Sequence, residues 1–274
     1  MDSEAEDSDR DPLATYVRLH AMRALEGVRQ FDAAPSVEVV HDTRTSLRRL
    51  RATTRTFPQS FPDLLDDDAD LQWVALGFGA VRDADVLAEL LLHLAELLSP
   101  DAADAPSSEQ HALAVALTSA REEAIQDLRA HAEHERWTRA VRQLELWTVA
   151  PPALASTELE GTTEDTLRRA RDTVRRRLST SEGQSIALHS ARKAAKRWRY
   201  AAELLAPVEP AAQEHLEVAQ QVQDVLGELQ DTVIGIEFLE TVHRPGSHGT
   251  LTGRLLDALS SSRSRLVTRA GTLL

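Results

Sequence analysis

The sequence predicts an all-α fold built from one helical unit that occurs twice. Three observations predict this fold class. Apolar residues recur at helical spacing along most of the 274 residues, and no stretch alternates with a period of two over the length of a strand. A segment rich in histidine and arginine occurs a second time 148 residues further along the chain. In both copies the cationic residues fall on one face of the expected helix.

The first basic segment lies between Val40 and Phe57. Each residue of an α-helix advances by about 100°, so residues with suitable spacing share one face. An arc of about 80° contains His41, Arg44, Arg48, Arg51 and Arg55. The apolar face beside it contains Val40, Leu47, Leu50 and Phe57. We therefore expect a helix with one face in the core and an adjacent positive face, from which Arg49 points away.

The second basic segment repeats this pattern. Its cationic residues occupy the same helical angles as their counterparts and are His189, Arg192, Lys196 and Arg199. Its apolar face contains Leu188, Ala195, Trp198 and Leu205. Tyr200 lies beside the cationic face, at an angle of about 20°. A second helix with a core face and a positive face is therefore expected.

The same offset of 148 residues relates positions outside the basic segments, such as Val74 and Val222, Gly79 and Gly227, and Asp83 and Asp231. We infer two copies of one helical unit, related by a pseudo-twofold axis that places the two cationic faces opposite each other. The expected organisation is a disordered acidic tail at residues 1–11, a first repeat at 12–149, a linker at 150–162 and a second repeat at 163–274.

Helical spacing and helix-ending residues give the expected bounds of each helix. In the first repeat, helices are expected over residues 12–30, 36–57, 67–81, 84–98, 109–134 and 136–149. In the second, they are expected over 163–179, 185–205, 211–228, 231–242 and 251–273. Asp83 and Asp231 then lie at helix–helix junctions, where capping or pairing with a basic residue is a more common role than catalysis.

The overall charge is acidic, but the cations are clustered. The net charge is −13, yet residues 41–55, 168–177 and 189–199 hold 16 of the 31 Lys and Arg residues. An acidic surface around a basic site can direct an anion to that site. The chain has no cysteine, its apolar runs are too short to span a bilayer, and its first residues do not resemble a targeting signal. A cytoplasmic protein without membrane contact is expected.

Sequence motifs of common enzyme classes are absent. There is no phosphate-binding loop, no dinucleotide-binding glycine motif and no set of His and carboxylate residues with metal-ligand spacing. No catalytic triad can be nominated from spacing. The sequence therefore predicts a protein that is not an enzyme and that has no metal and no cofactor.

The cationic faces favour a linear polyanion as the ligand. Four cations over about 14 residues of helix span about 20 Å, and arginine binds phosphate groups in a bidentate manner. A third wall could come from Arg168, Arg171 and Arg175, which share one side of the helix expected over 163–179. Tyr200 could donate a hydrogen bond to a phosphate. The alternative is that these arginines are ordinary surface residues or pair with carboxylates of neighbouring helices.

Both basic segments resemble a known family. The patterns V-H-D-x-R-x-x-x-R-R-L-R (Val40 to Arg51) and L-H-x-x-R-K-x-x-K-R-x-R-Y (Leu188 to Tyr200) resemble the CHAD domain, the conserved histidine α-helical domain. Residues 79–86 also resemble its G-x-x-R-D-x-D-V pattern, for which the second half retains only Gln230-Asp231. The resemblance covers about residues 12–273 and implies one domain made of two four-helix-bundle-like halves around a central basic groove.

The resemblance implies binding of inorganic polyphosphate without catalysis, and an association with polyphosphate granules or polyphosphate-metabolising enzymes. By motif position, the binding residues are His41, Arg44, Arg48, Arg51, His189, Arg192, Lys196 and Arg199. Arg55 fits the same face, although its counterpart in the second copy is Glu203. Two alternatives are RNA binding in the same groove, which an aromatic content of 4% disfavours because bases stack on aromatic rings, and an enzyme acting on phosphoanhydrides.

Overall fold

The computed structural model describes residues 11–31, 35–57, 61, 67–98, 107–152, 162–179, 185–207, 209–242 and 250–273. Within these ranges the chain forms nine α-helices and no strand, which confirms the all-α prediction. The expected acidic tail, except for its last residue, and most of the expected linker lie outside the described residues. No described helix is both long and apolar enough to cross a membrane.

The first half of the chain contains α2 (Pro12–Gln30), α3 (Val37–Thr56), α4 (Asp67–Leu97), α5 (Ser108–Ala132) and α6 (Glu135–Val149). Side-chain caps set several of their starts. Asp11 accepts hydrogen bonds from two backbone N–H groups of α2, whose first residue is Pro12. Ser36 caps α3, and Ser107 forms a reciprocal capping box with Gln110 at the start of α5.

The second half contains α7 (Thr162–Ser179), α8 (Ser185–Leu205), α9 (Pro210–Val242) and α10 (Leu251–Thr272). The start of α8 follows the start of α3 by 148 residues, which is the offset of the sequence repeat. The order of α2 to α5 therefore parallels that of α7 to α10, while α6 has no counterpart among the described helices. The pseudo-twofold relation between the halves stays a prediction.

Two expected helix breaks are wrong. Residues 67–97 form the single helix α4, and residues 210–242 form the single helix α9. The polar run that includes Asp83 and Asp85 suggested a break in α4, but its side chains pair with arginines of other helices. Asp83 and Asp231 thus lie in the middle of long helices and cap neither.

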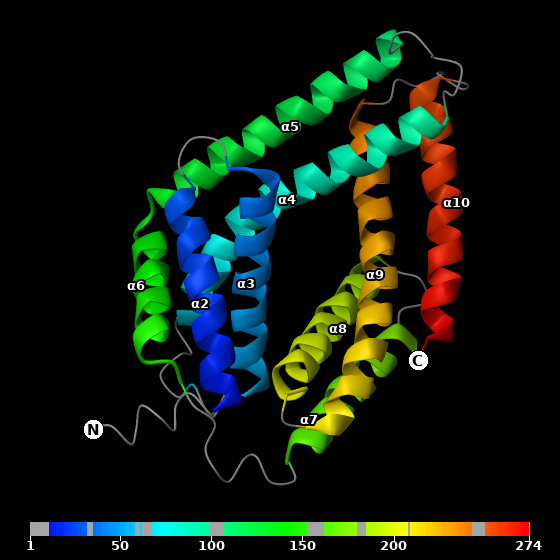
Figure 1. Ribbon diagram of the computed structural model, residues 1–274. Helices are drawn as coiled ribbons and strands as arrows, with labels where there is room; N and C mark the ends of the chain where they lie inside the picture. The colour runs from blue at the N-terminus through cyan, green and yellow to red at the C-terminus, as the bar shows by residue number, and fades with distance from the viewer. Residues whose placement is uncertain are drawn as a thin grey trace.

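Each of these two long helices contributes residues to two hydrophobic cores. The larger core draws on both halves of the chain and includes Val74 and Phe78 of α4. The second core joins the C-terminal parts of α4 and α9 to α5 and α10, and it includes Leu91 and Leu239. Figure 1 shows α4 and α5 running together from the first half toward α9 and α10. The halves also meet where α3 packs against α8.

The expected apolar faces of the two basic helices lie in the larger core. In α3 and just after it, Val40, Leu47, Leu50 and Phe57 are buried. In α8, Ala195, Trp198 and Leu205 are fully buried, whereas the side chain of Leu188 lies outside the described residues. Burial of these faces orients the cationic residues of both helices toward one shared space.

Candidate functional site

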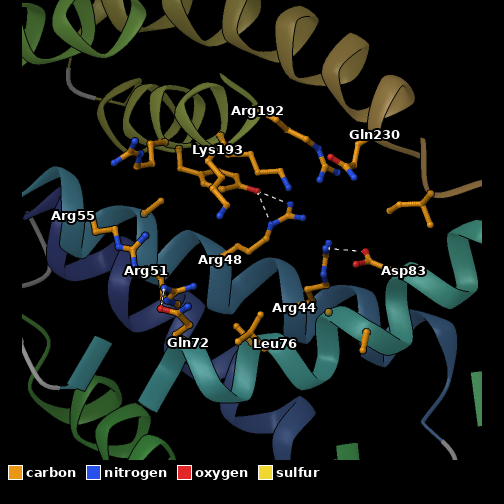
Figure 2. Close-up of a pocket in the computed structure, with 18 of the residues that line it drawn as sticks. Arg44, Arg48, Arg51, Arg55, Gln72, Leu76, Asp83, Arg192, Lys193 and Gln230 are labelled. Carbon is orange, nitrogen blue, oxygen red and sulfur yellow. Dashed lines mark hydrogen bonds and ion pairs between the residues drawn. The ribbon is translucent and has the colours of Figure 1, made fainter. Parts of the chain in front are cut away.

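A cavity of about 590 Å³ lies between α3, α4, α8 and α9, and we call it the cationic groove. Among the described residues that line it, nine are cationic and one, Asp83, is acidic. The cationic residues are Arg44, Arg48, Arg51, Arg55, Arg177, Arg192, Lys193, Lys196 and Arg197. Figure 2 shows the α3 arginines and the α8 cations extending toward one another across the groove. Small and apolar residues of α4, such as Ala75 and Gly79, form part of the remaining wall.

Neighbouring polar side chains hold the α3 arginines in place. The Nη2 atom of Arg44 lies 3.1 Å from Asp83 Oδ1. Arg51 donates a 2.9 Å hydrogen bond to the side-chain oxygen of Gln72. Both partners lie on α4, so α4 holds two of the four α3 arginines that line the groove.

Tyr200 holds Arg48 from the other side. Its hydroxyl oxygen accepts hydrogen bonds from Arg48 Nη2 at 2.6 Å and Nε at 3.2 Å. The ring is 2% exposed and lies within 6 Å of the guanidinium carbons of Arg48, Arg49 and Arg199. Tyr200 therefore lines the groove as a support for Arg48.

Arg49 points away from the groove, as its helical angle predicted. It forms an ion pair with Glu203 of α8, with 2.7 Å between Nε and Oε1. The hydroxyl of Tyr16 in α2 donates to the same carboxylate. Glu203 thus ties three helices together, which explains why the repeat has an acid at the position that corresponds to Arg55.

Lys196 is the most strongly perturbed cation of the groove. Burial, and to a smaller extent the positive charges of Arg48, Arg192 and Arg44, together lower its pKa from 10.5 to about 5. Burial and the charge of Arg48 also lower the pKa of Arg44 to about 10. The groove is therefore a site where an additional negative charge would be strongly stabilised.

The groove has two different ends. At the end we call the acidic end, Arg44 lies beside Asp83, and Arg192 interacts electrostatically with Asp231 of α9. Burial raises the pKa of Asp231, against the opposing effect of Arg192. The other end, which we call the basic end, contains Arg55, Arg177 and Arg197. Burial and the charges of Arg177 and Arg55 lower the pKa of Arg197.

Arg192 contains an unsatisfied donor in this groove. Its Nε atom is buried and has no hydrogen-bond partner among the described residues. Burying a polar group without a partner is costly, and native proteins mostly avoid it unless a ligand or a water satisfies the group. An anion in the groove could accept this hydrogen bond.

Most, but not all, predicted site residues line the groove. Those that do are Arg44, Arg48, Arg51, Arg55, Arg192, Lys196 and Tyr200. His41 is exposed and lies outside the lining, as does Arg199, whose guanidinium packs on the ring of Tyr200. The side chain of His189 lies outside the described residues.

The helix α7 contributes a different arginine to the groove than the three that the sequence suggested. Arg168, Arg171 and Arg175 are exposed and do not line the groove. Arg168 pairs with Asp165 at 2.6 Å, and Arg171 lies 3.8 Å from Asp172. From α7, the groove instead receives Arg177, which also donates to the backbone oxygen of Ser190. The helical angle of Arg177 pointed away from the other three, and only the packing of α7 against α8 reveals its position.

Sequence reasoning also missed Lys193, Arg197, Gln72 and Gln230, all of which line the groove. Lys193 and Arg197 each follow a predicted residue directly. A wide groove is lined by more than one narrow stripe of α8, so adjacent positions also reach it. Clustering of charge in residues 189–199 was the signal that could have found them.

The groove offers electrostatic binding chemistry. Within the described ranges, no three His, Cys, Asp or Glu residues come together in a way that could hold a metal ion. Arginine forks on opposite walls can bind separate phosphate or carboxylate groups of one extended ligand.

Comparison with known proteins decides the family. Residues 17–240 match the CHAD domain. The chain belongs to the CHAD domain family. No curated protein matches it.

Two solved structures share the fold. PptA from Streptomyces chartreusis superimposes with a TM-score of 0.71 at 18% identity, over 96% of each chain. The CHAD domain from the plant Ricinus communis gives a TM-score of 0.63 at 19% identity, over 96% of this chain and 86% of that one. These likenesses confirm the fold of this CHAD protein.

Proposed function

We propose that this CHAD protein binds inorganic polyphosphate in the cationic groove, without catalysing a reaction. The observation that carries the proposal is the concentration of nine cations on facing helices of a chain whose net charge is −13. Folding these like charges together costs free energy, as the lowered pKa of Lys196 reflects. A bound polyanion would offset this cost.

The shape of the groove favours an extended ligand. Arg44 and Arg55 are separated by 11 residues of α3, which corresponds to about 16 Å along the helix. A single phosphate group would reach only part of this row. A chain of phosphates can place one group near each successive arginine, which suits the bidentate geometry of the guanidinium.

Titration with polyphosphates of graded length tests the proposal. Affinity should rise with chain length until the groove is filled, and it should fall steeply with salt because each neutralised phosphate releases counterions. Fluorescence anisotropy of end-labelled polyphosphate at several salt concentrations measures both effects.

Charge reversal provides the specific test. Arg44→Glu combined with Arg192→Glu should abolish binding, since both residues line the groove. A matched control combines Arg265→Glu and Arg269→Glu, which make the same charge change at exposed positions of α10 outside the groove. Undiminished affinity in a folded Arg44/Arg192 double variant would refute the proposal.

RNA is the competing ligand in the same titration. The described lining residues offer no open aromatic platform for bases, because the ring of Tyr200 is 2% exposed and packed against arginines. We therefore expect polyphosphate to displace RNA at equal charge concentration. Release of orthophosphate from polyphosphate with Mg²⁺ present would instead indicate an enzyme. We further propose a cytoplasmic location, at polyphosphate granules or beside polyphosphate-metabolising enzymes, which fluorescence microscopy of tagged protein tests.

A further inference from the structure

Two carboxylates lie near one end of the groove, and one of them, Asp83, is among its described lining residues. Asp83 comes from α4 and Asp231 from α9, at positions related by the repeat offset. Asp83 lies 3.1 Å from Arg44. Asp231 interacts electrostatically with Arg192, Asp83, Lys196 and Arg44. Asp83 therefore lines the acidic end, and Asp231, which is not among the described lining residues, interacts with the same group of cations.

The opposite end has no such barrier among its described lining residues. Arg55, Arg177 and Arg197 come from three different helices and provide only positive charge there. In Figure 2, Arg55 and Asp83 lie at opposite sides of the view, with Arg48 between them. A negatively charged chain would therefore be attracted by the cations along the groove and repelled where it would have to pass the two carboxylates.

Another cation, Arg82, lies near Asp83 but is not among the described lining residues of the groove. His41 lies one turn before Arg44 on α3, and Arg82 directly precedes Asp83. Partial burial of its ring and the positive charge of Arg82 lower the pKa of His41. Asp83 thus stands between the cations that line the groove and the further positive charge of Arg82.

The ends of a polyphosphate differ chemically from its middle. A terminal phosphate has a second ionisable oxygen, and the second ionisation of a phosphate group occurs near pH 6. Near the acidic end, three cations surround the space: Arg44, Arg192 and Lys196. Such a cluster suits the extra charge of a terminal group. An internal segment would have to continue past both carboxylates, where its own charges are repelled.

We propose that Asp83 and Asp231 close the acidic end, so that the groove takes the terminus of a polyphosphate chain, which leaves past Arg55. This inference rests on the proposed function and adds the part of the polymer that is recognised. The terminal phosphate lies near Arg44 and Arg192, and the rest of the chain extends toward the basic end.

The test compares two polyphosphates of equal length. One has free termini, and the other has both terminal phosphates coupled to a bulky amine as phosphoramidates. Wild-type protein should bind the blocked polymer roughly tenfold or more weakly, because a blocked end does not fit and an internal segment is repelled. The variant Asp83→Asn/Asp231→Asn should bind both polymers with affinities that agree within about twofold. Its acidic end no longer carries the negative charges that repel an internal segment.

A second measurement uses Arg82, which lies beyond the carboxylates of the acidic end. In the wild type, Arg82→Ala should leave affinity unchanged, since the chain ends before Arg82. In the Asp83→Asn/Asp231→Asn background, Arg82→Ala should lower affinity, because a chain that passes the former barrier reaches it. The slope of log affinity against log salt should also be steeper in this background, by roughly 0.7–0.9 for each additional phosphate bound.

A matched control keeps the charge change but moves it elsewhere. Glu135→Gln combined with Glu145→Gln removes two exposed acids that pair with arginines outside the groove. This control should retain the wild-type preference for free termini. If the carboxylate double variant unfolds, Asp83→Asn alone keeps the test valid, because the side chain of Asp83 is 50% exposed.

The outcomes separate the two proposals. A wild-type protein that binds free and blocked polymers equally well overturns the end-recognition inference and leaves polyphosphate binding intact. The same inference fails if the carboxylate variants keep the full preference for free termini. A wild-type protein that binds neither polymer at low salt overturns both proposals.

Discussion

Replacing Lys196 by methionine should stabilise the empty protein and weaken its binding of polyphosphate. Lys196 is partly buried in the cationic groove, where burial and three neighbouring arginines lower its pKa to about 5. At pH 7 the folded protein therefore holds this amine uncharged, whereas the unfolded chain protonates it. Methionine has a similar length and no charge to remove from water, so the substitution eliminates this cost of folding.

The size of the effect follows from the pKa difference. The ordinary lysine pKa of 10.5 lies about 3.5 units above pH 7, and one unit corresponds to about 1.4 kcal/mol, so the upper limit is roughly 5 kcal/mol. Because the groove is open to water, we expect less than half of this, about 2 kcal/mol. For a protein of this size, that gain raises the melting temperature by roughly 5 °C.

The pH dependence identifies the cause. Between pH 5 and 10.5 the unfolded chain binds one more proton at this position than the folded protein, so the wild type gains stability as pH rises through this window. The advantage of Lys196→Met should therefore be large at pH 7 and should vanish near pH 10.5. Polyphosphate binding should weaken about 10- to 100-fold, the value of one charge-assisted contact.

The assay combines chemical denaturation with NMR. Denaturation at pH 7 and pH 10 gives the two stability differences. The chain contains only two lysines, Lys193 and Lys196, so selective lysine labelling yields two side-chain signals that can be titrated directly. Lys193→Met is the matched control, because it also lines the groove but is exposed, and it should leave stability unchanged. A Lys196 signal that titrates near pH 10, or an equal gain in stability at both pH values, would refute the reasoning.

Three further substitutions test other parts of the structure. Tyr200→Phe removes the hydroxyl that accepts two hydrogen bonds from Arg48, so polyphosphate affinity should fall about five- to tenfold in the same anisotropy titration. Burial lowers the pKa of His20 to about 3, so the wild type should lose stability as pH falls from 6.5 toward 3, whereas His20→Leu should lack this loss; urea denaturation at pH 7 and 4.5 measures it. Gly227→Ala meets no atom within 4 Å and should stabilise α9 by about 0.5–1 kcal/mol, whereas Gly27→Ala places its Cβ against the side-chain oxygen of Thr43 in α3 and should cost about 1–3 kcal/mol, both measured by thermal denaturation.

The helical class and the faces of the basic helices could be predicted from the sequence. Helical angles alone separated Arg48, which lines the groove, from Arg49, which pairs with Glu203 outside it. The same angles identified Trp198 as a core residue, and it is fully buried. These successes depend on periodicity within one helix, which neighbouring helices do not alter.

Helix continuity could not be predicted in the same way. The polar residues between Val81 and Leu87 interrupt the apolar pattern of α4, and such interruptions commonly mark a loop. In the folded protein, α4 passes from one core to the other at this point, and its polar residues pair with arginines of neighbouring helices. A change of packing partner along one helix and a break between two helices look alike in the sequence.

The groove lining also depended on packing between helices. Arg177 and Arg197 reach the basic end because α7 packs on α8, which no periodicity within either helix encodes. Conversely, Arg168 and Arg171 had a suitable spacing but pair with acids of their own helix. The hydroxyl of Tyr200 was expected to meet a ligand, and its contact with Arg48 is a property of the assembled groove.

Because α4 and α9 are unbroken, packing at one end of these helices can affect the groove at the other end. Both helices run from the groove to the second hydrophobic core, where they are joined to α5 and α10. Because α4 and α9 also line the groove, their packing in this core should influence the distance between the groove walls. Gly235 of α9 lies beside this core, and a Cβ atom added to it would be within 4 Å of Leu259, Leu90 and Leu91. A bulkier residue at position 235 should push α9 away from α4 and α10. The width of the groove should then change although none of its cations is contacted.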